Sequence, residues 1–570
     1  MFLPTTRAEL SKLGWNKLDI VLLTGDSYID SPFIGAAVIG KVLTNAGYRV
    51  GIIAQPDLHS QRDITRLGEP KLFWGVTGGS VDSMIANYTS LLKQRRNDDY
   101  TPGGINNRRP DRATIIYTNL IKQYFKDTVP IVLGGIEASL RRIVHYDYWS
   151  NKIRSSILFD AKADYLLYGM AEKSVIELAA ALKSGNSVHN IKGLCYIAHE
   201  TEIAEKQGGY LELPSFEQSS TDKELFTKMF QTFYRNNDAI TAKGLYQKHG
   251  TRYLIHNPPS LPLTQKEIDA IYALDYERAQ HPYYERQGKV KALETIKFSI
   301  STHRGCYGEC NFCAITVHEG RTVQWRSVDS ILSEATKLTF YPDFKGYIMD
   351  IGGPTVNMYG FECGKKLKQG ACENKRCLYP EVCPTLKADH RHQLELLRKI
   401  RKIPGVKKAF VASGLRYDLL LRDKAYAGKY LEELVEHHVS GQMKIAPEHT
   451  GDRVLRLMGK PSTESLMQFK DLYDRANLKA RKTQFLTYYL IAAHPGCTAS
   501  DMLKLKQFTS ARLHIKPEQV QIYLPAPSTY SALMYYTEKD PFTGKQIFVE
   551  KNLRNKATQK EIMVAKMNLS

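Results

Sequence analysis

The sequence predicts an α/β chain made of an N-terminal doubly wound domain followed by a (β/α)₆ partial barrel. Two observations support this fold class. Short apolar runs alternate with amphipathic stretches in both halves, as parallel sheets with helical crossovers require. The 570 residues also exceed one typical domain several-fold, so two or three domains are expected. We place the domains at 1–200, 201–290 for a linker and helical region, and 291–565, with a Cys-rich insertion at 357–390.

The N-terminal domain is predicted from its alternation of strands and helices. The expected strands are 18–23, 48–53, 72–76, 130–133 and 164–168, and the expected helices are 35–45, 113–124 and 173–182. Such an alternation predicts an open parallel sheet with room for a ligand at the carboxyl ends of its strands. Gly78-Gly79 and Gly134-Gly135 lie at those ends.

Arg141 and Arg142 follow the second glycine pair closely. Exposed amides and guanidinium groups hold phosphate or carboxylate, so one interpretation is an anion site. The other is a tight turn with a basic surface. Farther on, residues 201–290 show no strong strand pattern. Residues 257–262 have the composition of an extended linker, and a helix over 265–278 is expected to lead into the barrel.

The barrel is predicted from six short apolar runs separated by amphipathic stretches. The runs are 296–302, 347–353, 409–415, 442–446, 485–493 and 520–524, and the main helices between them are 327–340, 392–402, 430–438, 465–476 and 500–514. Active sites of such barrels lie at the carboxyl ends of the strands. Residues that follow the expected strands are therefore candidates for the site.

The candidate binding residues follow the second, third and fourth barrel strands. They are Gly352, Gly353, Pro354, Ser413, Arg416 and Glu448. We predict that Arg416 and Glu448 contact a cofactor or substrate, with a surface ion pair as the alternative. His449 and His494 are interpreted as structural, hydrogen-bonded residues. No catalytic residue is assigned.

Cys306, Cys310 and Cys313 form a CxxxCxxC pattern just after the first barrel strand. Three thiolates on one loop hold three irons of a cubane cluster, whose usual complement is four cysteines. The fourth iron is then open to a ligand, as in catalytic metal sites. A zinc loop or a disulfide knot is the alternative, but the spacing matches neither paired CxxC motifs nor an even disulfide set.

Four further cysteines lie in the insertion, at positions Cys363, Cys372, Cys377 and Cys383. Four thiolates complete either a zinc tetrahedron or a second iron–sulfur cluster, and the spacing does not distinguish the two. Cys195 and Cys497 are interpreted as ordinary buried thiols.

The run Cys306-Tyr307-Gly308-Glu309-Cys310-Asn311-Phe312-Cys313 resembles the cluster loop of radical S-adenosylmethionine (SAM) enzymes, including the aromatic residue before the third cysteine. The resemblance implies that the three cysteines bind a [4Fe-4S] cluster and that SAM chelates the fourth iron. An electron then cleaves SAM to methionine and a 5′-deoxyadenosyl radical, which abstracts hydrogen from a substrate. It also implies that Gly352-Gly353-Pro354 matches the family's motif for the SAM amino group, with Pro354 where Glu is common. A flavodoxin- or ferredoxin-like electron donor is expected as a partner.

The N-terminal domain resembles the cobalamin-binding domain of one class of radical SAM enzymes. The DxHxxG motif of that domain would read Asp26-Ser27-Tyr28-Ile29-Asp30-Ser31 here, without the His or the Gly. We therefore favour a recognition domain without cobalamin, with bound cobalamin as the alternative. The whole chain resembles the YgiQ-type, UPF0313-like family of radical SAM proteins, through residues 350–355 and their continuation over 357–363.

The net charge of +20 favours polyanionic partners, and residues 391–408 hold seven basic residues against one acidic residue. Nucleic acid is therefore a candidate partner, although a helix with a solvated basic face explains the segment equally well. No apolar run approaches 18 residues, so we expect a cytoplasmic protein without a membrane segment. The leading function is a radical SAM enzyme of unknown substrate. The alternatives are an RNA-modifying methylthiotransferase, whose family has three more cluster cysteines in its first domain where this chain has only Cys195, and a non-catalytic iron–sulfur or zinc scaffold with a basic binding face.

Overall fold

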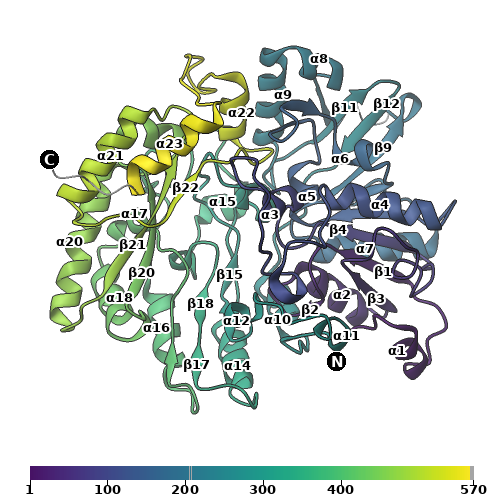
Figure 1. The fold of residues 1–570 in the computed structure, drawn as a ribbon, viewed down its shortest axis with the longest axis horizontal. Coiled ribbons are helices and arrows are strands. Elements are labelled where there is room, and N and C mark those ends of the chain that lie inside the picture. Colours follow the sequence, from purple (N-terminus) through teal and green to yellow (C-terminus); the bar gives the residue numbers. More distant parts are fainter. Residues whose placement is uncertain (204–205, 207, 565–570) are drawn as a thin grey trace. The chain divides into compact units, whose positions relative to one another are not determined.

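The computed structural model describes residues 1–203, 206 and 208–564. The chain forms two compact units, one of Met1–Pro262 with Ala270–Lys297 and the other of Leu263–Asp269 with the chain from Phe298 onward. Both units are α/β in structure (Figure 1). None of the described helices has the length and apolar character needed to span a bilayer.

The first unit is built around a nine-stranded sheet in the described part of the chain. Its order is β10 (Tyr210–Leu213), β11 (Gly244–His249), β12 (Arg252–His256), β9 (Leu194–His199), β8 (Tyr165–Leu167), β5 (Ile131–Gly134), β4 (Phe73–Thr77), β1 (Ile20–Thr24) and β3 (Val50–Ala54). The last five strands in this order are mutually parallel. Their order is that of a flavodoxin-like doubly wound sheet, which confirms the predicted fold class.

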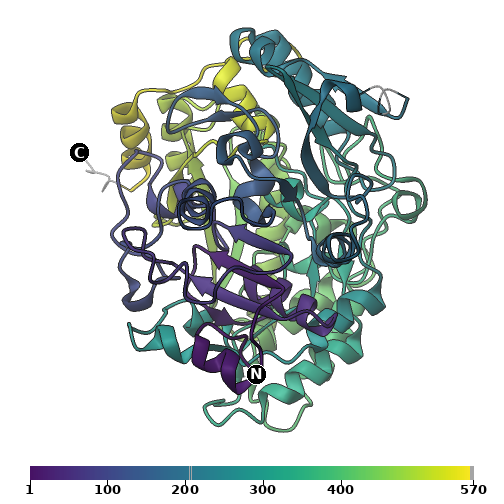
Figure 2. The same ribbon diagram turned by 90° about the vertical axis from the view of Figure 1, so that its right-hand side faces the viewer.

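Both faces of this sheet are buried. Along β1, Ile20 and Leu22 enter one apolar core while Val21 and Leu23 enter the other, because side chains alternate along a strand. Helices α2 (Gly35–Asn45) and α7 (Glu172–Ser184) supply the first core, and α4 (Ala113–Tyr124) and α6 (Ile157–Ala161) supply the second. Figure 2 looks onto this unit. Continuous apolar strands such as residues 20–23 are the pattern that a doubly covered parallel sheet requires.

The prediction of a linker and helical region over 201–290 is right about the helices but misses three strands that join the first sheet. Strands β10, β11 and β12 extend the first sheet, with α8 (Phe216–Thr221) and α9 (Lys223–Arg235) between β10 and β11. Strands β11 and β12 form an antiparallel hairpin, and polar residues interrupt their apolar pattern. The helix expected over 265–278 ends earlier, at α10 (Gln265–Ala273), because the Asp30 carboxylate and carbonyl accept the amides of Glu277 and Arg278.

The second unit has the predicted partial barrel. Strand β14 (Ser299–Ser301) pairs with β18 (Asp350–Gly352), β17 (Tyr347–Ile348) with β19 (Lys408–Ala409), and Leu415 bridges to Ile445. Strand β20 (Gln442–Glu448) then pairs with β21 (Phe485–Ala492), and β21 with β22 (Val520–Ile522). All these pairings are parallel and follow chain order, as a (β/α)₆ barrel requires.

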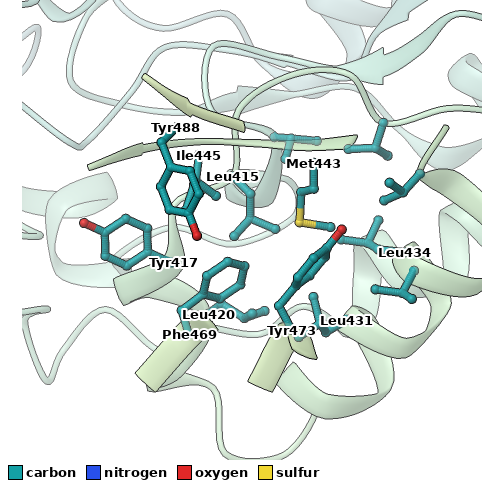
Figure 3. Packing of buried hydrophobic residues seen from close by; sticks show 14 of the residues in the cluster. Leu415, Tyr417, Leu420, Leu431, Leu434, Met443, Ile445, Phe469, Tyr473 and Tyr488 are labelled. Atoms are coloured by element: carbon teal, nitrogen blue, oxygen red, sulfur yellow. The ribbon is translucent and has the colours of Figure 1, made fainter. Parts of the chain in front are cut away.

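Helices separate the barrel strands and cover their outer side (Figure 1). They are α14 (Val328–Leu338), α16 (Arg391–Ile400), α18 (Ala427–Glu433), α20 (Thr463–Lys479) and α21 (Ala499–Ala511). Figure 3 shows the core between strand and helix, where Met443 and Ile445 of β20 meet Phe469 and Tyr473 of α20. The strand expected over 409–415 is regular only at its start, because the Asp350 carboxylate accepts the amides of residues 412 and 413 in place of a strand partner.

Candidate functional site

The CxxxCxxC loop follows the first barrel strand, as predicted. After β14 the chain forms β15 (His303–Arg304), which pairs with β16 (Gln324–Trp325), and the loop then leads into α13 (Ile315–Glu319). Gly305 turns the chain into the loop with φ +82°, and a Cβ there would lie 2.3 Å from the carbonyl oxygen of Thr322. Only glycine accommodates this entry into the loop.

Hydrogen bonds hold the loop in a compact form. The Gly308 amide donates to Cys306 Sγ at 3.4 Å, and the Cys313 amide donates to the Cys310 carbonyl at 3.0 Å. The Asn311 side chain donates to the Leu457 carbonyl at 2.9 Å, in the last turn of α19 (Asp452–Met458). This contact satisfies a carbonyl that a helix end leaves open, so the loop is anchored to the barrel.

Burial raises the pKa of the Cys306 thiol, and the neighbouring Cys310 acts in the same direction. Burial likewise raises the pKa of Cys313 well above its ordinary value. Burial therefore disfavours thiolates in this loop, and the positive charge of cluster iron would offset that cost. The donor set of three soft sulfur ligands fits such a cluster.

Arg416 supplies a fixed positive charge beside the same loop. Its Nη1 donates to Cys310 Sγ at 3.4 Å, while Nε and Nη2 donate to the Asp418 carboxylate at 2.7 and 3.1 Å. Although burial opposes the charge, Asp418 and Cys310 raise the pKa of Arg416 above its ordinary value. The side chain is buried, so the alternative of a surface ion pair is wrong for this residue.

Glu448 ends β20 in a buried position with φ +67°. Its Oε1 lies 3.8 Å from Lys460 Nζ, and burial raises its pKa. Ala493 after β21 and Ser528 after β22 also have positive φ, at +58° and +61°. Left-handed backbone at non-glycine residues is costly and concentrates at functional sites, so these strand ends are the strained edge of the barrel. Glu448 is buried, so a surface ion pair is excluded for it as well.

Gly352 and Gly353 bring the end of β18 close to side chains of the barrel. A Cβ on Gly352 would lie 2.1 Å from Ser413 Oγ, and one on Gly353 would lie 2.4 Å from the His303 ring. The Ser413 hydroxyl donates to Asp350, so it already has a partner within the chain. Pro354 is half-buried. The two glycines are thus required by the packing of the chain itself.

Thr355, Asn357 and His303 also belong to this site but are not among the candidate residues selected from the sequence. Thr355 Oγ1 lies 3.7 Å from Cys306 Sγ, and the Thr355 carbonyl accepts a hydrogen bond from His303 Nε2 at 3.0 Å. The Asn357 side chain exchanges hydrogen bonds with the backbone of Arg416 at 2.8 and 2.9 Å. Both Thr355 and Asn357 lie within or next to the glycine-rich run after β18, which is the signal that identifies them.

His449 and His494 have structural roles. The Gly451 amide donates to His449 Nδ1 at 2.8 Å, and His494 Nε2 lies 2.7 Å from Ser531 Oγ. Burial lowers the pKa of His449 to about 4 and that of His494 to about 3. Phe312, just before the third loop cysteine, packs edge-on against His494 with ring centroids 6.2 Å apart.

Comparisons with known proteins identify the family of the chain. Residues 300–509 match the radical SAM superfamily model, and residues 2–299 match the radical SAM N-terminal model. The chain belongs to the radical SAM superfamily. Its relatives are named UPF0313 proteins. One from Fusobacterium nucleatum is 55% identical and one from Thermotoga petrophila is 48% identical, each over 99% of both chains. One from Clostridium botulinum is 46% identical over 99% of this chain and 86% of its own.

Two solved radical SAM structures align with most of the chain at TM-scores below 0.5. The methyltransferase TsrM from Kitasatospora setae, with cobalamin and a [4Fe-4S] cluster bound, superposes with a TM-score of 0.49 at 15% identity, over 91% of this chain and 78% of that one. The cobalamin-dependent enzyme OxsB with aqua-cobalamin bound has a TM-score of 0.49 at 11% identity, over 93% of this chain and 57% of that one. Membership of the radical SAM superfamily implies a [4Fe-4S] cluster and SAM for the chain described here.

Cobalamin does not fit the carboxyl edge of the first sheet. In a sheet of this order a ligand is expected between the ends of β1 and β4. Arg109 occupies that place, with a fully buried side chain that donates to the Gly78 carbonyl at 2.7 Å and pairs with Asp26 at 2.9 Å and Asp98 at 3.0 Å. A Cβ on Gly25 would lie 2.1 Å from the Gly78 carbonyl oxygen. The crevice of this radical SAM chain is filled by its own side chains.

The residue at the position of the cobalamin-ligating histidine of the DxHxxG motif also argues against bound cobalamin. Tyr28 stands there and is 1% exposed. Its hydroxyl accepts a hydrogen bond from the Leu3 amide at 2.9 Å, and its ring stacks on His281 at 5.3 Å. The side chain is part of the apolar core, so it has no access to a corrin ring.

Neither interpretation of the Gly134-Gly135 segment matches the structure. Arg141 pairs with Asp82, and Arg142 is fully buried, donating to His256 Nε2 and Asn237 Oδ1 at 3.0 Å each. The two guanidinium groups therefore bind partners inside the first unit, so they form neither an anion site nor a basic surface.

The basic segment over 391–408 forms α16 and the turn after it. Arg398 and Arg401 both donate to Glu433, at 2.9 Å each. Part of the charge of this segment is thus paired within the chain, which favours the interpretation of a solvated helix face.

Proposed function

We propose that this protein is a radical SAM enzyme in which Cys306, Cys310 and Cys313 hold a [4Fe-4S] cluster whose fourth iron takes SAM. The observation that carries the proposal is the compact loop of three thiols with Arg416 at its edge, within a chain of the radical SAM superfamily. The cluster and SAM would supply an electron and a 5′-deoxyadenosyl radical for hydrogen abstraction from a substrate.

The side chains around the loop stabilise the cluster in this proposal. Arg416 offsets thiolate charge at Cys310, and Thr355 faces Cys306 with its hydroxyl 3.7 Å away. Hydrogen bonds to cluster sulfur ligands lower the energy of the more negative, reduced state. Asp418 and Asn357 act one step away, because they hold the guanidinium and the backbone of Arg416.

The strand ends provide the SAM site in this proposal. Gly352 lies close to Ser413, and Gly353 lies close to His303, which precedes the cluster loop. The buried Glu448 lies at the end of β20. Burial raises the pKa of Glu448, and its carboxyl group would hydrogen-bond the polar groups of SAM. A flavodoxin- or ferredoxin-type donor would deliver the electron.

The experiment is anaerobic reconstitution with iron and sulfide, followed by SAM, dithionite and chromatography for 5′-deoxyadenosine. We expect 5′-deoxyadenosine from the reconstituted chain and none from Cys310→Ala. Cys195→Ala is the control, because Cys195 lies buried in β9 of the first unit and has no part in the loop. A loaded cluster that binds SAM without cleaving it, with or without a reduced flavodoxin, would instead indicate the non-catalytic scaffold.

A further inference from the structure

The Cys-rich insertion in the second unit contains a long segment without regular structure. Between α15 (Gly364–Gln369) and α16, residues 370–390 form neither helix nor strand. Loops of this length are uncommon inside compact domains unless something besides the backbone holds them. Leu378 and Leu386 are nevertheless 0% and 2% exposed. The segment is therefore folded into the unit by its side chains.

Three cysteines of the insertion are linked by short contacts. Cys363 Sγ and Cys383 Sγ lie 3.7 and 3.1 Å from the same hydroxyl, Thr385 Oγ1. The Cys383 amide donates to the Cys377 carbonyl at 2.8 Å, which brings these two residues together. Cys372 is half-buried and lies five positions before Cys377. All four are free thiols. Cys363, Cys377 and Cys383 thus share close neighbours, and Cys372 belongs to the same segment of the chain.

A buried cation lies beside this group. Lys366 is 3% exposed, and its Nζ lies 3.9 Å from Cys377 Sγ and 2.9 Å from the Glu362 carboxylate. It also donates to the Arg321 carbonyl at 2.8 Å. Placing a charged lysine in the interior is costly unless negative partners compensate. Glu362 provides one negative charge, and thiolates ligated to a metal would provide more.

The insertion is attached directly to the CxxxCxxC loop. Arg376, which precedes Cys377, donates to the Glu309 carbonyl at 3.1 Å and to Asn311 Oδ1 at 2.7 Å. Lys366 Nζ lies 5.1 Å from the centre of the Tyr307 ring. The two cysteine sets therefore share hydrogen-bonded neighbours, and a metal in the second set would lie next to the first loop.

The spacing of the thiols favours a cluster over zinc. Zinc draws four sulfurs to within about 4 Å of one another, because each Zn–S bond is only about 2.3 Å long. Among the residues that the structure describes, no three His, Cys, Asp or Glu side chains converge closely enough for a single metal ion. The loop cysteines 306, 310 and 313 share this open arrangement, as expected where each sulfur binds a different iron. The described side chains of Cys363, Cys372, Cys377 and Cys383 likewise form no site for a single metal ion.

We propose that Cys363, Cys372, Cys377 and Cys383 bind a second iron–sulfur cluster, fully ligated by protein, next to the SAM-cluster loop. This site has four thiols for four irons, so it offers no open iron to SAM. Its role is to fold the insertion.

The test uses the intact chain reconstituted anaerobically with iron and sulfide. We expect about eight irons per chain, four for each cubane, by metal analysis and Mössbauer spectroscopy. The Cys306→Ala/Cys310→Ala/Cys313→Ala variant should retain about four irons and the visible absorption of a cluster. This variant has no SAM site, so its result does not depend on whether SAM is cleaved.

The matched variant is Cys372→Ser/Cys377→Ser, with Cys195→Ala as a control that should keep full loading. The double variant should lose about half of the iron and keep the first cluster. The number of irons in the wild-type chain alone tests the proposal. A variant that fails to fold therefore does not affect the result. About four irons in the wild-type chain, with or without one zinc, would overturn the proposal.

Discussion

At the scale of single residues, the site depends on a few buried polar groups placed against the cysteine loop. Arg416 is the clearest case, because it joins Cys310 Sγ to the Asp418 carboxylate while Asn357 holds its backbone. The sequence allows its selection, since an arginine follows a predicted strand end. Its partner Asn357 lies 59 positions away. Such a contact depends on the barrel closing, so local pattern does not predict it.

Removal of Arg416 tests this buried pair. We expect Arg416→Met to lower the free energy of unfolding by about 3–5 kcal/mol, because Asp418 is then buried without its partner. The Arg416→Met/Asp418→Leu double variant should recover most of that loss. Urea denaturation of the cluster-free chain measures the free energy of unfolding of both variants. Equal losses of stability in the two would show that the unpaired Asp418 carboxylate is not the cause.

Gly353 tests the close approach of β18 to His303. Alanine at this position would place a Cβ 2.4 Å from the His303 ring. We expect Gly353→Ala to lose about 1–3 kcal/mol of stability through overpacking, and to load less iron because His303 supports Thr355. Gly414→Ala is the control, since no atom lies within 4 Å of its added Cβ. Similar iron loading and melting temperature in both variants would contradict the packing argument.

At the scale of elements, long apolar strands and strongly amphipathic helices were predictable from sequence. Helices α2 and α4 have the predicted bounds, and β20 and β21 differ by no more than two residues at an end. The missed strands β11 and β12 form an antiparallel hairpin with polar side chains between apolar ones, so the pattern of a buried strand is absent. The strand after Ala409 was overpredicted because Asp350 binds its backbone. Tertiary contacts decide such cases.

The strand ends of the first sheet give a prediction about cobalamin. Arg109 and its two carboxylate partners fill the edge between β1 and β4, so we expect no cobalamin to bind. The measurement is gel filtration after incubation with hydroxocobalamin, with the cobalamin absorbance followed in the protein peak. Retention at about one cobalamin per chain would show that this edge opens and would contradict the packing argument.

At the scale of the whole molecule, both units bury neutral histidines. Burial lowers the pKa of His249 in the first unit to about 4, where its ring stacks on Phe159 and Phe216. Burial also lowers the pKa of His494 in the second unit to about 3. The ordinary value in an unfolded chain is about 6.5. These histidines therefore bind protons at a lower pH in the native chain than in the unfolded chain.

This difference predicts the pH dependence of stability. As the pH falls from about 6.5 to about 4, the unfolded chain binds protons that the native chain does not, so stability decreases with falling pH. The contribution of His249 is about 3 kcal/mol over that window. We expect melting temperature to fall steeply below pH 6, and less steeply in His249→Phe, which keeps the aromatic stack. Parallel pH profiles of the two proteins would contradict a buried, neutral His249.

In the proposed function, three cysteines leave one iron of the first cluster open for SAM. Electron paramagnetic resonance of the reduced Cys372→Ser/Cys377→Ser variant, with and without SAM, tests it most directly because only the first cluster should contribute. We predict that SAM changes the spectrum of this cluster and that the Cys310→Ala change removes the signal. An unchanged spectrum at saturating SAM would contradict the account, since it would mean that no iron of this cluster accepts SAM as a ligand.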